Sequence, residues 1–264
     1  MFDVKIERPV CCPELAQGMD IIAQVAEKAY GGGSILCADA TGASVCSANM
    51  KEVLMNGRFE DPNAEYARRL ITQQELPGDG LKTAILLANA CLKTARDSGM
   101  DRQDFLAGVE FFLKTAAEKL REIVKANSED LPGGGLYLLN LCRPMMRAFE
   151  KGVTHPACQK FIYALEKPFL ILAQNAGCEP HGAFACIKAV APTQFYSLKQ
   201  FGLESGHIPM TEHRDLWRMG IDVQTGKVMD VMEAHITVPM ETALSVLKTA
   251  QAILFDVCAV CCVL

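Results

Sequence analysis

The segment from Gly80 to Arg96 constrains the fold most, because it is apolar on nearly every side of the helix that it predicts. Its sequence, GLKTAILLANACLKTAR, is rich in alanine, leucine and isoleucine and has no continuous polar stripe. Such a helix is stable in water only when other elements cover all of its faces. We therefore expect a mainly α-helical bundle with this segment at its centre.

Helical periodicity recurs on both sides of this segment, and strand patterns are few. Apolar spacing and terminal glycine or proline residues predict helices over 13–30, 62–71, 101–126, 136–150, 155–176 and 239–254. Alternation predicts strands over 2–7 and 256–264, a hairpin around Thr41-Gly42, and a short strand or turn over 226–234. The predicted fold class is mainly α, with a small β component made of terminal strands and one hairpin.

Composition and charge exclude several classes of protein. The chain has 264 residues, of which 50% are hydrophobic and 22% charged, which is typical of a compact globular chain. The net charge of −5 and the lack of a basic block make nucleic acid an improbable partner. We find no secretory signal and no apolar run of the ~20 residues that span a bilayer, so we expect a cytoplasmic protein without membrane contact.

The start of the apolar helix has the chemistry of a phosphate site. Gly78-Asp79-Gly80 is a turn that leads into a helix N-terminus, where backbone N–H groups and the helix dipole favour an anion. A carboxylate there would repel phosphate unless a cation lay between them, so Asp79 is a candidate Mg²⁺ ligand. The alternative is a plain helix start, since Asp caps helices and Gly suits turns. The spacing does not fit a P-loop.

The wider sequence resembles the chaperonin family, of both the GroEL and thermosome types. GDGLKTAILLANACL is similar to the family's Gly-Asp-Gly-Thr-Thr-Thr-Ala signature. Further similar segments follow the family's order over nearly the whole chain: DVKI, AEKAYGGG, DPNAEYARRL, LPGGGLYLL, PFLILAQNAG and GIDVQTGKVMDVMEAHITVP. The resemblance implies the equatorial domain of that family, which binds nucleotide and makes ring contacts.

Two domains of a full chaperonin have no place in this sequence. The family inserts intermediate and apical domains between the long helix and the Gly-Gly-Gly turn. Here only ANSEDL separates Lys125 from Pro132. We therefore expect one equatorial-like domain over 1–264, with the inserted domains absent between about 126 and 132.

The resemblance also implies a set of site residues, with ATP or ADP as the ligand. It implies that Asp79 holds Mg²⁺ with the nucleotide. Nucleotide contacts are implied for Gly31, Gly32, Asp79, Gly80, Lys82, Thr83, Gly134, Gly135 and Asp222.

Several departures from the family pattern bear on activity. Leu81 and Lys82 replace two threonines, and Lys82 offers charge in place of a hydroxyl. Asn49 replaces an aspartate that positions water, and an amide is no general base. Val238 replaces an acidic residue. We expect ATP hydrolysis to be weak or lost, with residual ATPase activity as an alternative.

The expected role is that of an assembly scaffold related to protein folding. The resemblance implies self-association or association with another chaperonin-like subunit, through the terminal strands and the hairpin over 34–47. Internal pairing of these strands in a monomer is the alternative.

Twelve cysteines permit a different function on the same scaffold. Without a secretory signal, reduced thiols are favoured over disulfides. A metal or redox site would need about four converging thiolates, for which the candidates are Cys11, Cys12, Cys258, Cys261 and Cys262. Buried structural thiols are the alternative.

Overall fold

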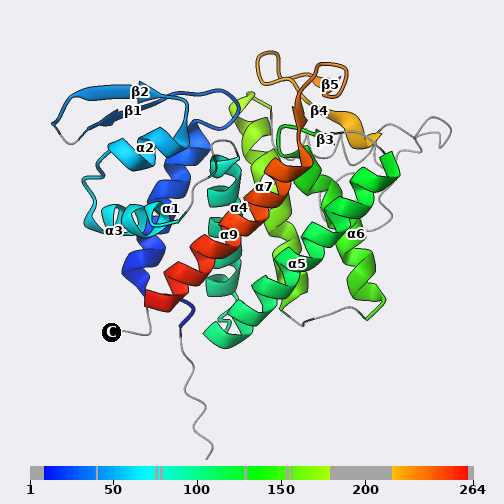
Figure 1. The fold of residues 1–264 in the computed structure, drawn as a ribbon, viewed down its shortest axis with the longest axis horizontal. Helices are drawn as coiled ribbons and strands as arrows, with labels where there is room; N and C mark the ends of the chain where they lie inside the picture. The colour runs from blue at the N-terminus through cyan, green and yellow to red at the C-terminus, as the bar shows by residue number, and fades with distance from the viewer. Residues whose placement is uncertain are drawn as a thin grey trace, which may run out of the picture.

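The computed structural model describes residues 9–39, 41–74, 77, 80–127, 130–152, 155, 157–178 and 216–260. Figure 1 shows a bundle of helices with three small sheets along one end. The helices are α1 (Pro13–Lys28), α2 (Met50–Asn56), α3 (Pro62–Thr72), α4 (Leu81–Asp97), α5 (Arg102–Asn127), α6 (Leu136–Glu150), α7 (Cys158–Asn175), the 3-10 turn η2 (Leu216–Arg218) and α9 (Met240–Val260).

The predicted central helix is α4. It packs against α1, α7 and α9 (Figure 1). Burial is continuous from Thr83 to Ala88, where Ala84, Ile85 and Leu87 are fully shielded from solvent. Burying a large aliphatic side chain contributes about 1.5–3 kcal/mol, so α4 alone supplies a large share of the hydrophobic stabilisation. The mainly helical fold class is confirmed.

A second part of the core forms where α5 meets α7. Phe161 of α7 lies with its ring centroid 5.7 Å from that of Phe105 and 5.7 Å from that of Phe112, both on α5. Edge-to-face and tilted contacts of this kind stabilise a core beyond the apolar area that they bury.

On the other side of the bundle, α1 and α3 approach so closely that a Cβ at Gly18 would lie 2.1 Å from the carbonyl oxygen of Asn63.

Three antiparallel pairs make up the described strands. The hairpin joins β1 (Ile35–Ala38) to β2 (Ser44–Ser47), with Leu36 opposite Cys46. The second sheet pairs β3 (Leu131–Pro132) with β6 (Thr237–Val238), and the third pairs β4 (Met219–Ile221) with β5 (Val228–Asp230). The predicted hairpin and the predicted short strand are thus confirmed, and β3 with β6 brings the glycine bend at 133–135 beside the start of α9.

The predicted closing strand is wrong where the structure describes it. Residues 256–260 continue α9, and Val257 and Cys258 lie buried on its inner face. Short apolar runs do not distinguish a strand from a buried helix, and here the helical spacing from Val246 onward decides. The predicted strand over 2–7, like residues 261–264, lies outside the described residues.

Helix α9 is the most apolar long helix in the described part of the chain. By length and composition it is apolar enough to cross a membrane, with a mean hydropathy of 1.6, and 50% of the apolar window is buried inside the domain. It packs against α3, α4 and α5, as a core helix does. Charges at Glu241, Lys248 and Asp256 interrupt the run in the sequence.

Helix α5 passes almost directly into β3. The helix ends at Asn127 and the strand begins at Leu131, so residues 128–130 form the whole connection.

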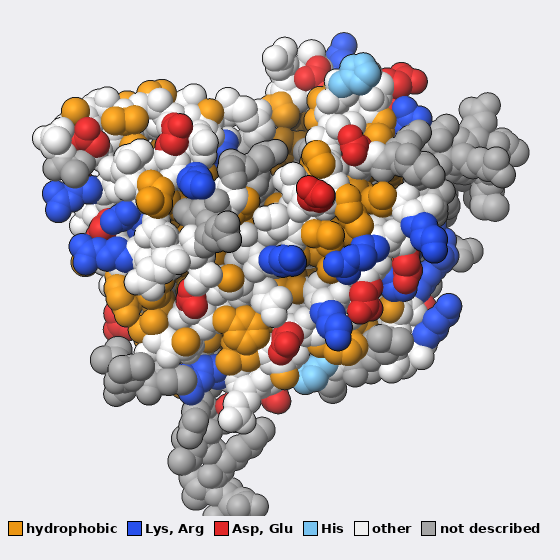
Figure 2. All heavy atoms as spheres, viewed as in Figure 1, with side chains coloured by type: hydrophobic (Ala, Val, Ile, Leu, Met, Phe, Trp, Pro, Cys, Tyr) orange, Lys and Arg blue, Asp and Glu red, His pale blue; other side chains and the backbone are white. Residues whose placement is uncertain are grey.

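On the face shown in Figure 2, lysine and arginine side chains gather over α5 and α6 with acidic side chains between them. That described face therefore has no continuous basic surface of the kind that nucleic acids require.

Candidate nucleotide-binding site

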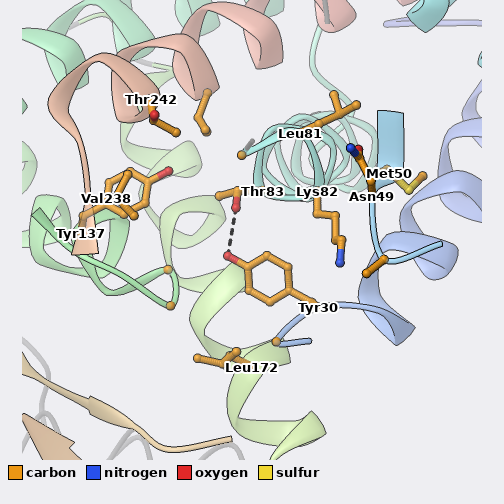
Figure 3. Close-up of a pocket in the computed structure, with 16 residues that line it drawn as sticks. Tyr30, Asn49, Met50, Leu81, Lys82, Thr83, Tyr137, Leu172, Val238 and Thr242 are labelled. Carbon is orange, nitrogen blue, oxygen red and sulfur yellow. Dashed lines mark hydrogen bonds between the residues drawn. The ribbon is translucent and has the colours of Figure 1, made fainter. Parts of the chain in front are cut away.

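A cavity of about 480 Å³ lies where the end of α1 meets the first turns of α4, α6 and α9 (Figure 3). These segments are far apart in the sequence, and β3 with β6 brings the last two together. The lining residues are Tyr30, Gly31, Ala48, Asn49, Met50, Gly80, Leu81, Lys82, Thr83, Gly134, Gly135, Tyr137, Leu172, Val238, Thr242 and Val246.

Two helix N-termini open into this cavity. Gly80 precedes α4 with φ 78°, Gly135 precedes α6 with φ 77°, and neither helix start has a side-chain cap. A Cβ at Gly80 would lie 2.5 Å from Cγ2 of Val246, and one at Gly135 would lie 3.0 Å from the backbone nitrogen of Phe169. Only glycine suits these positions. The positive ends of the two helix dipoles favour an anion in the cavity. In the first turn of α6, the N–H groups of Leu136, Leu138 and Leu139 already donate to the carbonyls of Gly133 and Gly135.

Lys82 places an ammonium group in the same cavity. Its Nζ donates a hydrogen bond of 2.7 Å to the carbonyl oxygen of Ala29, the residue that ends α1. A cation in the first turn of α4 opposes that helix dipole by about 0.3–1 kcal/mol. The negative end of the α1 dipole offsets this cost, so Lys82 is held as a fixed positive charge beside two positive helix ends.

Tyr30 is a lining residue that the sequence analysis missed. Its hydroxyl lies 3.0 Å from Oγ1 of Thr83, which is only 7% exposed (Figure 3). The bond ties the turn after α1 to the first turn of α4. The sequence does contain a signal for it. Tyr30 directly precedes Gly31-Gly32-Gly33, and a polar aromatic side chain next to a predicted ligand-binding turn is a candidate for the lining of that site.

Asn49 and Val238 line the cavity without supplying a carboxylate. The side-chain oxygen of Asn49 accepts a hydrogen bond of 2.9 Å from the backbone N–H of Lys51 and so caps α2. Its amide is therefore committed to a structural role as well as being a poor base. Val238 in β6 contributes only an apolar surface.

A second cavity of about 380 Å³ adjoins the first through Gly31, Gly134 and Leu172, which line both. Asp222 lines this second cavity. The hydroxyl of Thr225 and the backbone N–H of Gln224 donate to its carboxylate at 2.6 and 2.9 Å and hold the pKa of Asp222 below its usual value. Asp222 is therefore an anion at neutral pH, fixed at the edge of the cavity.

Comparison with known proteins gives this arrangement a family. The sequence profile of the TCP-1/cpn60 chaperonin family matches residues 113–257, more than half of the chain. This chain belongs to the TCP-1/cpn60 chaperonin family. Its fold is also similar to a solved structure described as the crystal structure of group III chaperonin in the open state. That match has a TM-score of 0.70 and 11% identity, over 93% of this chain and 97% of the other.

The structure brings most of the predicted chaperonin site residues together. Six of them line the first cavity, and Asp222 lines the second beside two of the six; the six are Gly31, Gly80, Lys82, Thr83, Gly134 and Gly135. Gly32 lines neither cavity, and a Cβ there would meet no atom within 4 Å. Asp79 lies outside the described residues. Whether these residues bind a nucleotide is a proposal, developed below.

The metal that chaperonin membership implies is Mg²⁺, and Asp79, its predicted ligand, lies outside the described residues next to the lining residue Gly80. Mg²⁺ in nucleotide sites is held by one or two carboxylates together with the phosphates. The first cavity has no carboxylate among its described lining residues, and Lys82 places a positive charge there.

The predicted thiol site is only partly described. Cys11 and Cys258 are buried and Cys12 is partly buried, while Cys261 and Cys262 lie outside the described residues. Within the described part of the chain, no group of three or more His, Cys, Asp or Glu side chains is placed to hold a metal ion.

Proposed function

We propose that this chaperonin-family chain is an equatorial-like module that binds a nucleotide through its phosphates and serves as an assembly scaffold. The observation that carries the proposal is the convergence of two glycine-capped helix N-termini on one cavity that also holds Lys82 and Thr83. The polar groups of this lining include the Lys82 ammonium and the Thr83 hydroxyl, and apolar side chains such as Leu172 and Val246 make up most of the rest. An anion with several acceptor oxygens, such as a nucleotide phosphate, satisfies such a lining best.

The equatorial-only organisation is part of the proposal. Residues 128–130 connect α5 to β3, and three residues leave no room for the intermediate and apical domains at that point. ATP hydrolysis needs a positioned water and a closed site. Asn49 is engaged as a helix cap and Val238 is apolar. We therefore propose that bound ATP is turned over very slowly or not at all.

Binding is tested by calorimetric titration of the purified chain with ADP and with ATP. Thr83→Val removes the hydroxyl beside the α4 N-terminus and is expected to weaken binding about tenfold, the effect of losing a hydrogen bond to a charged group. The matched control is Thr94→Val on the same helix, where the hydroxyl donates to the carbonyl of Ala90 instead. Failure of both nucleotides to bind the unaltered chain would refute the proposal.

Turnover is measured on the same samples by phosphate release. We expect release from ATP to match the protein-free background. Turnover that Thr83→Val abolishes would instead establish the alternative function, a residual ATPase.

Assembly is proposed through the hairpin of β1 and β2. The hairpin projects from the bundle (Figure 1), each strand has one unpaired edge, and Leu36 on it is 73% exposed. Open strand edges beside an apolar side chain favour pairing with another chain. Residues 256–260 are helical and cannot supply the partner strand, so the candidate partner is the segment over 2–7 of a neighbouring copy or of another chaperonin-like subunit.

Native mass measurement tests the assembly. We expect a species larger than 28.8 kDa that Leu36→Lys dissociates. Met55→Lys, at a side chain that is 55% exposed on α2, is the control and should leave the mass unchanged. A monomer in the unaltered chain at all concentrations would contradict the scaffold role.

A further inference from the structure

We propose that Asn175, the last residue of α7, is a positioning residue for the nucleotide, because it holds the turn at Gly31 in the shape that receives the ligand. The inference rests on the proposed nucleotide function. It adds to that function a residue that lines neither of the two cavities.

The backbone carbonyls around the end of α1 accept hydrogen bonds from two other helices. Carbonyl groups at a helix end lack the partners that the helix interior provides, so side chains often satisfy them. Nδ2 of Asn175 donates to the carbonyl oxygens of Glu27 and Tyr30 at 2.7 and 2.9 Å. Nζ of Lys82 donates to the carbonyl oxygen of Ala29, which lies between these two in the sequence. The turn after α1 is therefore held by α7 and by α4.

This turn forms part of both cavities. Gly31 lines the first cavity and the second, and so does Leu172, which lies one helical turn before Asn175 on α7 (Figure 3). The two are in close contact, since a Cβ at Gly31 would lie 2.7 Å from Cδ1 of Leu172. Helix α7 thus supports the turn twice, with the Leu172 side chain in the cavity wall and with the Asn175 amide at the carbonyls.

An ion pair between the same two helices gives much weaker support. Nζ of Lys167 lies 3.6 Å from the carboxylate of Glu27, and the two side chains are 47% and 34% exposed. Exposed ion pairs of this kind contribute little, because water and salt screen them. The Asn175 amide instead fixes two backbone carbonyls in one geometry.

A turn that is already ordered favours binding. A ligand that meets a preformed site does not pay the entropy of ordering it. If the turn samples other shapes, the apparent affinity falls with the fraction of molecules that have the binding shape. Asn175 is exposed, so its hydrogen bonds compete with water and add little to global stability. Their loss should therefore appear in the affinity and not in the melting midpoint.

The test is calorimetric titration of Asn175→Ala and Asn175→Leu with ADP, well below the melting midpoint of each chain. Leucine keeps the branched shape of asparagine and removes its donors. We expect both variants to bind ADP about three- to tenfold more weakly than the unaltered chain, with an unchanged midpoint. Hydrogen exchange at residues 30–33 should be faster in both variants without ligand and should return to the unaltered rate with saturating ADP.

The matched control is Gln174→Ala, at the exposed neighbouring residue of α7, which should leave the affinity and the exchange rates unchanged. An unchanged ADP affinity in both Asn175 variants, whether or not the midpoint falls, would overturn the inference and leave the proposed function standing. An equal loss of affinity in Gln174→Ala would also overturn it. Lack of ADP binding by the unaltered chain would refute the proposed function, and the inference with it.

Discussion

The hydroxyl of Tyr30 is hydrogen-bonded to the hydroxyl of Thr83, across 53 positions of sequence and at a distance of 3.0 Å. Together with the bond from Lys82 to Ala29, it fastens the turn after α1 to the first turn of α4. The glycine turn at one side of the cavity and the helix N-terminus at the other therefore move as one unit.

Removing the phenol hydroxyl should loosen this unit. Tyr30→Phe is expected to lower the free energy of unfolding by about 1 kcal/mol, because a partly buried hydrogen bond is lost while the ring remains. Urea denaturation measures the change. Hydrogen exchange should become faster at residues 29–33. Tyr163→Phe, at a side chain that is 61% exposed, is the control, and an equal effect there would contradict this account.

Adding one methyl group at Gly18 should be far more damaging than helix propensity suggests. Alanine is normally favoured over glycine inside a helix by roughly 1 kcal/mol. At Gly18 the new Cβ would lie 2.1 Å from the carbonyl oxygen of Asn63, which is backbone and cannot turn away. We expect Gly18→Ala to destabilise the fold by at least about 2 kcal/mol, as overpacking does. A thermal melt shows the effect, and an unchanged midpoint would mean that α1 and α3 separate freely.

Acid should weaken the contact between α3 and α2, because Glu65 holds the guanidinium of Arg68, which donates to the carbonyl oxygen of Leu54 in α2 at 2.6 Å. Hydrogen bonds from Arg68 and Arg69 lower the pKa of Glu65 from 4.5 to about 2, against the opposing effect of burial. A carboxylate with a depressed pKa stabilises the fold above pH 4.5, and that contribution disappears as the pH falls from 4.5 toward 2. Glu65→Gln should cost about 1–2 kcal/mol at pH 7 and much less at pH 2.5. Urea titrations at both pH values provide the comparison; a penalty independent of pH would rule out this linkage.

Thiol reactivity should follow burial. Burial raises the pKa of Cys158 to about 11 and also raises the pKa of the fully buried Cys91, whereas Cys46 on the hairpin is exposed. Only thiolates react rapidly with disulfide reagents. Mass spectrometry after brief labelling should find Cys46 modified before Cys158, and Cys91 modified only after unfolding. Early labelling of Cys91 would show that α4 opens in the native state.

The sequence predicts this fold well where a pattern is local. The apolar composition of α4, the Asp101 side chain that caps the start of α5 and the glycine bend at 133–135 each depend on residues within a few positions of one another. The hydroxyl of Tyr30 escaped prediction because its partner is distant in the sequence and the pair forms only after α1 and α4 pack. The end of α9 escaped because a short apolar run suits a strand or a buried helix equally.

In the candidate site, too, the features that depend on local sequence are predictable, and those that depend on contacts between distant residues are not. Glycine at the start of α4 and of α6 is predictable from the turn-to-helix pattern, and the resemblance to chaperonins predicts that the two turns line one site, as they line one cavity here. The role of Asn49 as the cap of α2 is foreseeable from its residue type. The position of the Lys82 ammonium against Ala29 is not, because a flexible side chain can reach many partners before the fold fixes one.

The direct passage from α5 to β3 has a mechanical consequence. Three residues join them, which is too short a segment to connect a further domain to the cavity at this point of the chain. The described contact that leads outward is lateral: Asn49 lines the cavity, and its backbone N–H donates to the hydroxyl of Ser47 at the base of the hairpin. Under the proposed function, a change in occupancy of the cavity would therefore reach the hairpin of β1 and β2 through Asn49 and Ser47.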